Sequence, residues 1–293
     1  MTAYRFCRTD DRALLVAAFE SCRGPEDEAE PPLDNEGFKR LVRDLDLWCS
    51  SCMVAFEGKD AVGVLLGAKR ATTTLVYGLR VHPEHRRLGH ARHLLTSLSS
   101  KLAILGPPGL LAEVPAERRK VAGAAFEACG WKLTGEFRDW CRPAGRNREP
   151  ALPVGGAARE ALGPVSLDDL VSGGLVGNGL CCWQRDLPAL TKPGRSIEGL
   201  AFHSQERLEA WALYEPSATA GEPCQIFLTG SAEGPLGRFG FSTVMDELAT
   251  RAADSPLVLA RAAPDEIEPD LLGEVGFEPG YKYFLYTSEA LAA

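Results

Sequence analysis

The stretch from Thr73 to Leu105 constrains the fold more than any other part of the sequence. Thr73 to Val81 is a largely apolar run that stops just before Pro83, and it predicts a strand. Beyond the next few residues, apolar side chains recur at spacings of three and four, which predict a helix with one apolar stripe: Ala91, Leu94, Leu95, Leu98, Leu102 and Leu105. A strand followed so closely by an amphipathic helix favours a sheet that is covered by helices.

The rest of the first half supplies further elements. Helices are predicted over 10–19 and 36–45, and strands over 52–56 and 61–68 on either side of a turn. After the stripe, a strand over 110–114 precedes a helix over 118–129, which Gly130 ends, and a last strand begins near Trp131. The predicted order is a helix pair, an antiparallel meander, and then strand, helix, strand, helix and strand.

The loop between the strand and the helix reads Arg86-Arg87-Leu88-Gly89-His90-Ala91. A helix start directs unpaired main-chain N–H groups at one spot, where the helix dipole also favours negative charge. Gly89 lets a ligand approach without a Cβ in the way, Ala91 keeps the first turn open, and the two arginines add positive charge. The loop therefore predicts a binding site for a pyrophosphate.

These residues resemble the central motif of the GNAT superfamily of N-acetyltransferases, Q/R-x-x-G-x-G/A after a strand that ends in V-x-P. The strand end here is Val81-His82-Pro83, and the motif falls on the residues from Arg86 to Ala91. The family's later signature, N-x-x-A-x-x-x-Y-x-x-x-G-F, falls at the same spacing on Arg119, Ala122, Phe126, Gly130 and Trp131. The resemblance covers about residues 3 to 142.

The resemblance implies an acyl-CoA-dependent enzyme with acetyl-CoA as its co-substrate. Main-chain groups of one strand would hold the pantetheine arm, and the amides of the loop would take the pyrophosphate. The implied cofactor-binding residues are Leu79, Arg80, Val81, Arg86, Arg87, Leu88, Gly89, His90, Ala91, Arg119 and Phe126. Arg119 stands where the family has Asn, and is read either as a contact to a coenzyme A phosphate or as a surface arginine of the helix.

The catalytic groups are less clearly indicated than the loop. The family often uses a tyrosine to protonate the departing thiolate, but that position is Phe126, whose ring has no proton to donate. Glu113 is the first candidate for the base, because its strand is expected to diverge from its neighbour where the acyl group lies. Glu84 and His82 are further candidates beside the loop.

An acidic loop precedes the second helix and carries Glu26, Asp27, Glu28, Glu30, Asp34 and Glu36. Because the family's first helices shape the acceptor pocket, these carboxylates either attract a cationic amine or belong to an ordinary solvated loop.

The second half repeats this plan in a weakened form. A helix-like stretch over 166–171, strands over 208–214 and 225–229, and a helix with Val244, Met245 and Leu248 follow one another. Aligning the two helices places Leu236, Phe239 and Phe241 opposite Arg86, Gly89 and Ala91, so the phosphate loop is lost. The layout resembles tandem acetyltransferases such as mycothiol synthase.

We therefore expect an α/β (α+β) fold of two tandem GNAT-like domains, each a mixed, mostly antiparallel sheet flanked by helices. The domains are placed at 1–145 and 159–293, and a Pro/Gly-rich linker at 146–158. One acetyl-CoA is expected per chain, bound in the first half.

Composition narrows the possible partners. A net charge of -8 disfavours nucleic acid, and the longest apolar run, 61–68, is too short for a membrane span. Asp10 and Asp11 argue against a signal peptide, so a cytoplasmic location is expected. The nine cysteines are read as reduced thiols without a metal site; Cys49 and Cys52 are read as part of a core strand rather than as ligands or a redox pair.

The function expected from the sequence is transfer of an acyl group, acetyl in the first instance, to a primary amine of a small molecule or peptide by a monomer or homodimer. A non-catalytic acyl-CoA-binding regulator is the alternative, because Phe126 replaces the usual tyrosine.

Overall fold

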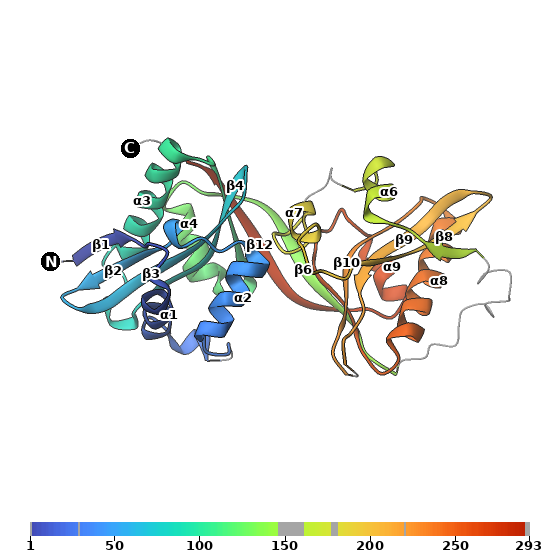
Figure 1. Cartoon of the computed structure of the whole chain (residues 1–293), viewed down its shortest axis with the longest axis horizontal. Helices are drawn as coiled ribbons and strands as arrows, with labels where there is room; N and C mark the ends of the chain where they lie inside the picture. Colours follow the sequence, from blue (N-terminus) through green and yellow to red (C-terminus); the bar gives the residue numbers. More distant parts are fainter. Residues whose placement is uncertain (1, 29, 146–160, 177–180, 220, 291–293) are drawn as a thin grey trace. The chain divides into compact units, whose positions relative to one another are not determined.

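The computed structural model describes residues 2–28, 30–145, 161–176, 181–219 and 221–290, which form two compact units (Figure 1). The first unit is Met1–Gly135 with Phe284–Ala293, and the second is Glu136–Tyr283. The predicted domains, 1–145 and 159–293, assign the last residues of the chain to the second domain, whereas the last strand takes part in the sheet of the first unit. The expected linker at 146–158 lies outside the described residues.

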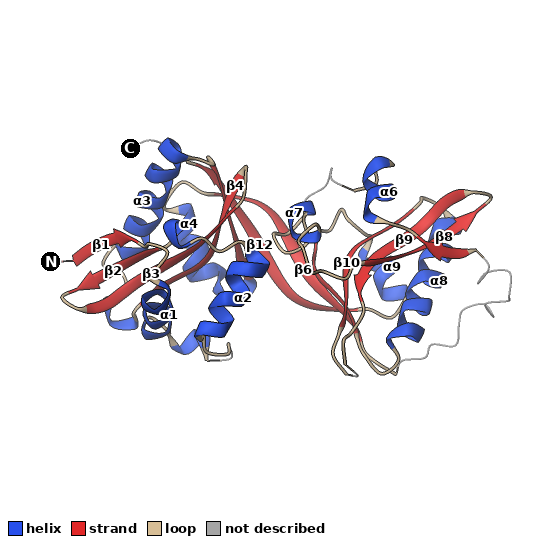
Figure 2. Ribbon diagram, in the orientation of Figure 1, coloured by secondary structure: helices blue, strands red, loops and turns tan. Residues whose placement is uncertain are grey.

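The first unit is a mixed sheet with helices on both faces (Figure 2). Its strand order is β1-β2-β3-β4-β5-β12, with β4 and β5 parallel and the β1 to β4 neighbours antiparallel. The strands are β1 (Thr2–Phe6), β2 (Met53–Glu57), β3 (Asp60–Lys69), β4 (Thr73–Val81), β5 (Gly109–Pro115) and the end of β12 (Glu278–Glu289). The helices are α1 (Arg12–Ser21), α2 (Asn35–Leu45), α3 (His90–Leu105) and α4 (Ala124–Glu127).

Strand β3 explains why the sheet is covered on both sides. Successive side chains of a strand point to opposite faces. Accordingly, Val64 and Leu66 pack in one core with Leu15 of α1, whereas Leu65 packs in another with Leu94 of α3. A strand buried on both faces reads as a continuous apolar run, as 61–68 does.

Three local predictions were wrong. Strand β1 was not anticipated. The residues Cys49–Ser51 form a 3-10 turn rather than the start of a strand. The helix expected over 118–129 divides into a 3-10 turn at Ala116–Arg118, a π turn at Arg119–Gly123, and α4. The π turn brings Gly123 against Tyr286 so closely that a Cβ there would lie 2.5 Å from the tyrosine hydroxyl.

The second unit repeats the order of the first, as β7-β8-β9-β10-β11-β6. Its strands are β7 (Leu162–Pro164), β8 (Glu198–Ser204), β9 (Arg207–Glu215), β10 (Cys224–Ser231), β11 (Leu257–Ala262) and the end of β6 (Lys132–Arg142). Its helices are α6 (Leu167–Ser172), α7 (Leu187–Leu190), α8 (Pro235–Ala252) and α9 (Pro269–Glu274). Each unit is therefore completed by a strand from the other half of the sequence.

The cysteines are free thiols in this structure, and five of the nine are buried. Burial raises the pKa of Cys7 to about 12 and that of Cys224 to about 11, which suits unreactive core residues. The residues that the structure describes contain no group of His, Cys, Asp and Glu suited to a metal ion. They also contain no helix with the length and apolarity that crossing a membrane requires.

Candidate functional site

Strand β4 ends where its partner on one side has diverged from it. In the described structure, β4 pairs with β5 only from Thr73 to Leu75, opposite Gly109 to Leu111. On the other side β4 stays paired with β3 up to Val81, with a bulge at Tyr77. The edge of β4 that faces β5 therefore presents main-chain groups without a paired strand, and these groups include members of the predicted set Leu79, Arg80 and Val81.

The loop after β4 has the geometry of an anion site. Arg87 adopts φ 65°, and Gly89, at φ 91° and ψ 0°, is the N-cap of α3. No side chain of the described residues caps this helix, so the first amides, which have no partner within the helix, remain available. A Cβ on Gly89 would meet no atom within 4 Å, so space lies open beside these amides. Such a helix start binds phosphate groups.

The two arginines of the loop have different surroundings. Arg86 pairs with Glu26, Nη2 to Oε1 2.5 Å, and its Nε donates to the carbonyl of Val81. Arg87 is exposed and has no ion pair among the residues that the structure describes. Arg86 thus anchors the loop, and Arg87 is the guanidinium left to meet a ligand.

The remaining loop residues divide between surface and core. Leu88 is exposed and Ala91 is half-buried, whereas His90 is buried. The His90 Nδ1 lies 2.7 Å from the hydroxyl of Tyr4 on β1, and the ring of His93 lies against the same tyrosine at 3.7 Å between centroids. Strand β1 therefore fixes the start of α3, a role that the sequence did not reveal.

The candidate acids and bases lie on either side of the loop. Glu113 is half-buried on β5, beyond the part of that strand that pairs with β4. His82 caps the 3-10 turn at Pro83–His85, where its Nδ1 accepts from the amide of Glu84. Glu84 itself is exposed. His82 and Glu84 thus shape the turn, and Glu113 stays a predicted base on the part of β5 that no longer pairs with β4.

Phe126 lies beside a tyrosine that the sequence interpretation did not consider. Its ring is stacked with that of Tyr286 on β12, 5.8 Å between centroids, and also contacts Trp131. The Tyr286 hydroxyl donates to Glu127 over 3.1 Å, and burial is the main reason that its pKa is raised. Arg119 is exposed, with its guanidinium over the ring of Phe284. The sequence signal that could have pointed to Tyr286 is the aromatic-rich stretch over 281–286, which occupies the place in the second repeat that β6 occupies in the first.

The acidic loop is an ion-pair cluster and not a free acidic surface. The buried side chain of Arg80 reaches Glu20, Asp27 and Glu30, the last over 2.6 Å, and lies over the ring of Phe19. Arg118 pairs with the same Asp27 and Glu30, each over 2.7 Å. Asp27 and Glu30 are therefore paired within the protein, and Glu26 of the same loop pairs with Arg86.

The second unit lacks an equivalent loop. Helix α8 begins at Pro235, so the residues opposite the phosphate loop are already helical. Phe241 is fully buried, and Arg238 pairs with Glu268 and Glu274 at 3.0 and 2.6 Å. Arg238, the basic residue of the second unit in the segment opposite the loop at 86–91, is therefore paired with acidic residues of its own unit.

Comparison with known proteins agrees with this geometry. The model of the acetyltransferase (GNAT) family matches residues 14–131. An acetyltransferase of Sodalis glossinidius is 31% identical over 104 residues, which cover 36% of this chain and 69% of that protein. The chain belongs to the GNAT acetyltransferase family. An acetyltransferase of Pectobacterium atrosepticum is 29% identical over 119 residues, 41% of this chain and 80% of that protein.

Solved structures show that the GNAT fold extends over both units. A GNAT protein of Sphaerobacter thermophilus is similar over 99% of this chain and 96% of its own, with a TM-score of 0.66 and 15% identity. A tandem GNAT protein from the clavulanic acid biosynthesis pathway is similar over the whole of both chains, with a TM-score of 0.63 and 15% identity. The prediction of a tandem α/β (α+β) GNAT fold is confirmed.

Proposed function

We propose that the protein is a cytoplasmic N-acetyltransferase that moves the acetyl group of acetyl-CoA to a primary amine of a small molecule or peptide. The observation that carries the proposal is the uncapped start of α3, with open space at Gly89, in the loop that follows the part of β4 that no longer pairs with β5. In a chain of the GNAT family, this arrangement suits a pyrophosphate on the helix amides and a pantetheine arm along β4. One acetyl-CoA binds per chain, in the first unit.

In the proposed reaction the amine attacks the thioester carbonyl directly. Glu113 accepts the proton that the ammonium must lose before its lone pair is free. The bond from nitrogen to the carbonyl carbon forms, the bond from carbon to sulfur breaks, and the thiolate leaves with the electron pair. We propose Tyr286, whose ring lies against Phe126, as the donor of a proton to the thiolate; the second proton, which the nitrogen loses as the amide forms, restores the phenol.

Titration with acetyl-CoA and an assay of free thiol test the proposal together. We expect one molecule of acetyl-CoA to bind per chain, and at least one primary amine of a broad panel to raise thiol release above the rate of hydrolysis. Tight binding without release for any amine would instead favour the regulatory alternative. Absence of binding would refute both.

A further inference from the structure

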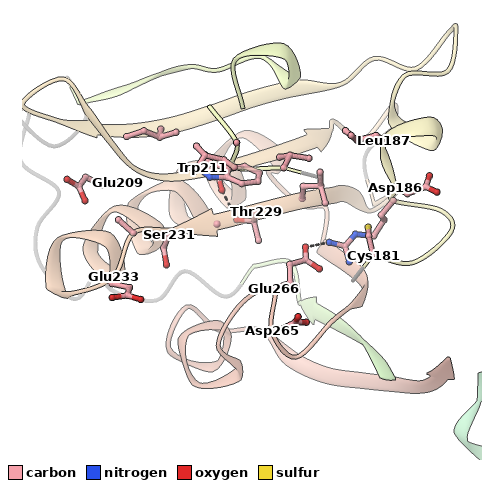
Figure 3. A pocket seen from close by; sticks show the side chains of 18 of the residues that line it. Cys181, Asp186, Leu187, Glu209, Trp211, Thr229, Ser231, Glu233, Asp265 and Glu266 are labelled. Atoms are coloured by element: carbon pink, nitrogen blue, oxygen red, sulfur yellow. Dashed lines mark hydrogen bonds and ion pairs between the residues drawn. The ribbon is translucent and has the colours of Figure 1, made fainter. Parts of the chain in front are cut away.

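The second unit contains a pocket of about 1000 Å³ that the transfer reaction proposed for the first unit does not use. Strands β9 and β10, the residues before and within α7, and the loop after β11 line it. In Figure 3, Glu209, Ser231 and Glu233 lie toward one end of the pocket and Cys181, Asp186 and Leu187 toward the other, with Trp211 and Thr229 between them.

A comparison of the two repeats shows that Trp211 takes a place beside the pocket that a charged side chain takes in the first unit. The amide of His82 donates to the carbonyl of Val62 in the first unit, and that of Ala232 donates to the carbonyl of Glu209 in the second, at the same place in the hairpin. By this register Gly230 stands where the first unit has Arg80. The side chain of Arg80 is buried among three acids, whereas beside Gly230 the ring of Trp211 lies where a side chain would begin, 3.0 Å from an ideal Cβ position.

The charged residues of the pocket leave it negative. Five carboxylates and two guanidinium groups line it: Asp186, Glu209, Glu233, Asp265, Glu266, Arg185 and Arg207. The fully buried Arg185 is already held by Glu266 and by the carbonyls of Phe227 and Ala260. The carboxylate of Asp186 caps α7. Arg185 is thus committed to the fold and does not offset the other acids.

Glu209 is the residue that indicates a ligand. It is 6% exposed and lines the pocket, and Arg207, whose Nε lies 3.7 Å away, is its one charged partner among the described side chains. That distance is too long for a hydrogen bond, and the side chain of Arg207 is 74% exposed. The carboxylate oxygens of Glu209 are not among the fully buried atoms that lack a hydrogen-bond partner, so they face the open pocket, where a cation that enters can pair with them.

The chemistry of the walls defines the class of ligand. Trp211, Leu208 and Leu228 give the pocket an apolar surface, and an aromatic face attracts an organic cation in addition. Glu209 and Glu233 lie near the end of β10, where the first unit has its phosphate loop, and they repel a diphosphate. We infer that this pocket binds an organic ammonium with a hydrocarbon body, and that it does not bind coenzyme A.

Titration calorimetry on the full chain tests the site with benzyltrimethylammonium, which cannot be acetylated, and with neutral benzyl alcohol. We expect saturable binding of the cation that weakens as salt is raised, and affinity for the alcohol lower by at least tenfold. Equal affinity for the two compounds, or displacement of the cation by coenzyme A, would overturn the inference.

Two variants locate the binding in this pocket. Glu209→Gln keeps the shape of the side chain, and we expect it to lower the affinity for the cation by at least tenfold. Glu233→Gln, at the exposed end of the pocket, should lower that affinity two- to fivefold. Glu222→Gln is the matched control, since it removes one exposed acid of the same unit and should change nothing. Gly89→Glu, in the other unit, should also bind the cation normally. Undiminished binding in Glu209→Gln, or loss in Gly89→Glu, would refute the assignment.

Discussion

Replacement of Gly89 by Glu tests the proposed coenzyme A loop most directly. No protein atom lies within 4 Å of a Cβ at this position, so the first carbon of the new side chain fits, and the expected effects are those of charge and of backbone conformation. A unit charge held about 5 Å from a phosphate charge costs about 3 kcal/mol at an effective dielectric constant of about 20. This corresponds to a loss of affinity for acetyl-CoA of roughly a hundredfold.

The backbone contribution is separated by two further variants. Gly89 has φ 91°, where a residue with a Cβ costs roughly 1–2 kcal/mol. Gly89→Ala carries that cost without charge, and we expect it to lower the unfolding midpoint but to change affinity less than tenfold. Gly194→Glu is the matched control, because Gly194 has φ 87° and an equally open Cβ position in the second unit.

Calorimetric titration with acetyl-CoA, alongside thermal unfolding of each variant, measures both quantities. We expect Gly194→Glu to bind like the unaltered protein. If Gly89→Glu stays folded and binds acetyl-CoA within threefold of Gly194→Glu, the pyrophosphate does not lie at this loop and the proposal for the site is wrong.

Four other outcomes are expected. Glu113→Gln should lower kcat about a hundredfold with little change in the KM for acetyl-CoA, and exposed Glu117→Gln should not; equal rates for the two would remove Glu113 as the base. Tyr286→Phe should lower kcat and, through the lost hydrogen bond to Glu127, stability by about 1 kcal/mol; an unchanged kcat would leave it a structural residue. Arg80→Met should lower the free energy of unfolding, measured in urea, by about 1–3 kcal/mol, because buried Asp27 loses one of its two arginine partners and keeps Arg118; a cost below about 1 kcal/mol would contradict the buried cluster. Finally, the pKa of Cys7 in the folded protein, about 12, lies above that of an unfolded thiol, so the stability that the buried thiol contributes is present below about pH 8.5 and is lost as pH rises toward 12. Between pH 9 and 11 the unfolding midpoint of Cys7→Ala should therefore fall less than that of the unaltered protein. An equal fall in the two proteins would contradict this reasoning.

The sequence predicted the elements whose periodicity is strong and local. Strand β4 and helix α3 lie within one residue of their predicted ends. Strand β1 escaped prediction because five residues with alternate burial carry little periodic signal. Tyr286 escaped because its contact with Phe126 joins positions 160 residues apart, which only the pairing of β12 with β5 brings together. The fate of the acidic loop depended in the same way on Arg80 and Arg118, which reach it from β4 and from the turn after β5.

The exchange of β6 and β12 also sets the order in which the protein is made and finished. The loop at 86–91 is synthesised early, yet the strand that brings Tyr286 against Phe126 emerges only after the whole second unit has been translated. During synthesis the first unit therefore has an incomplete sheet edge, and the last contacts to form are among the most distant in sequence, which slows their formation. A premature stop anywhere in the second half therefore removes the end of β12 from the first unit, in addition to the missing part of the second unit. Neither repeat of the sequence therefore contains all the strands of its own unit.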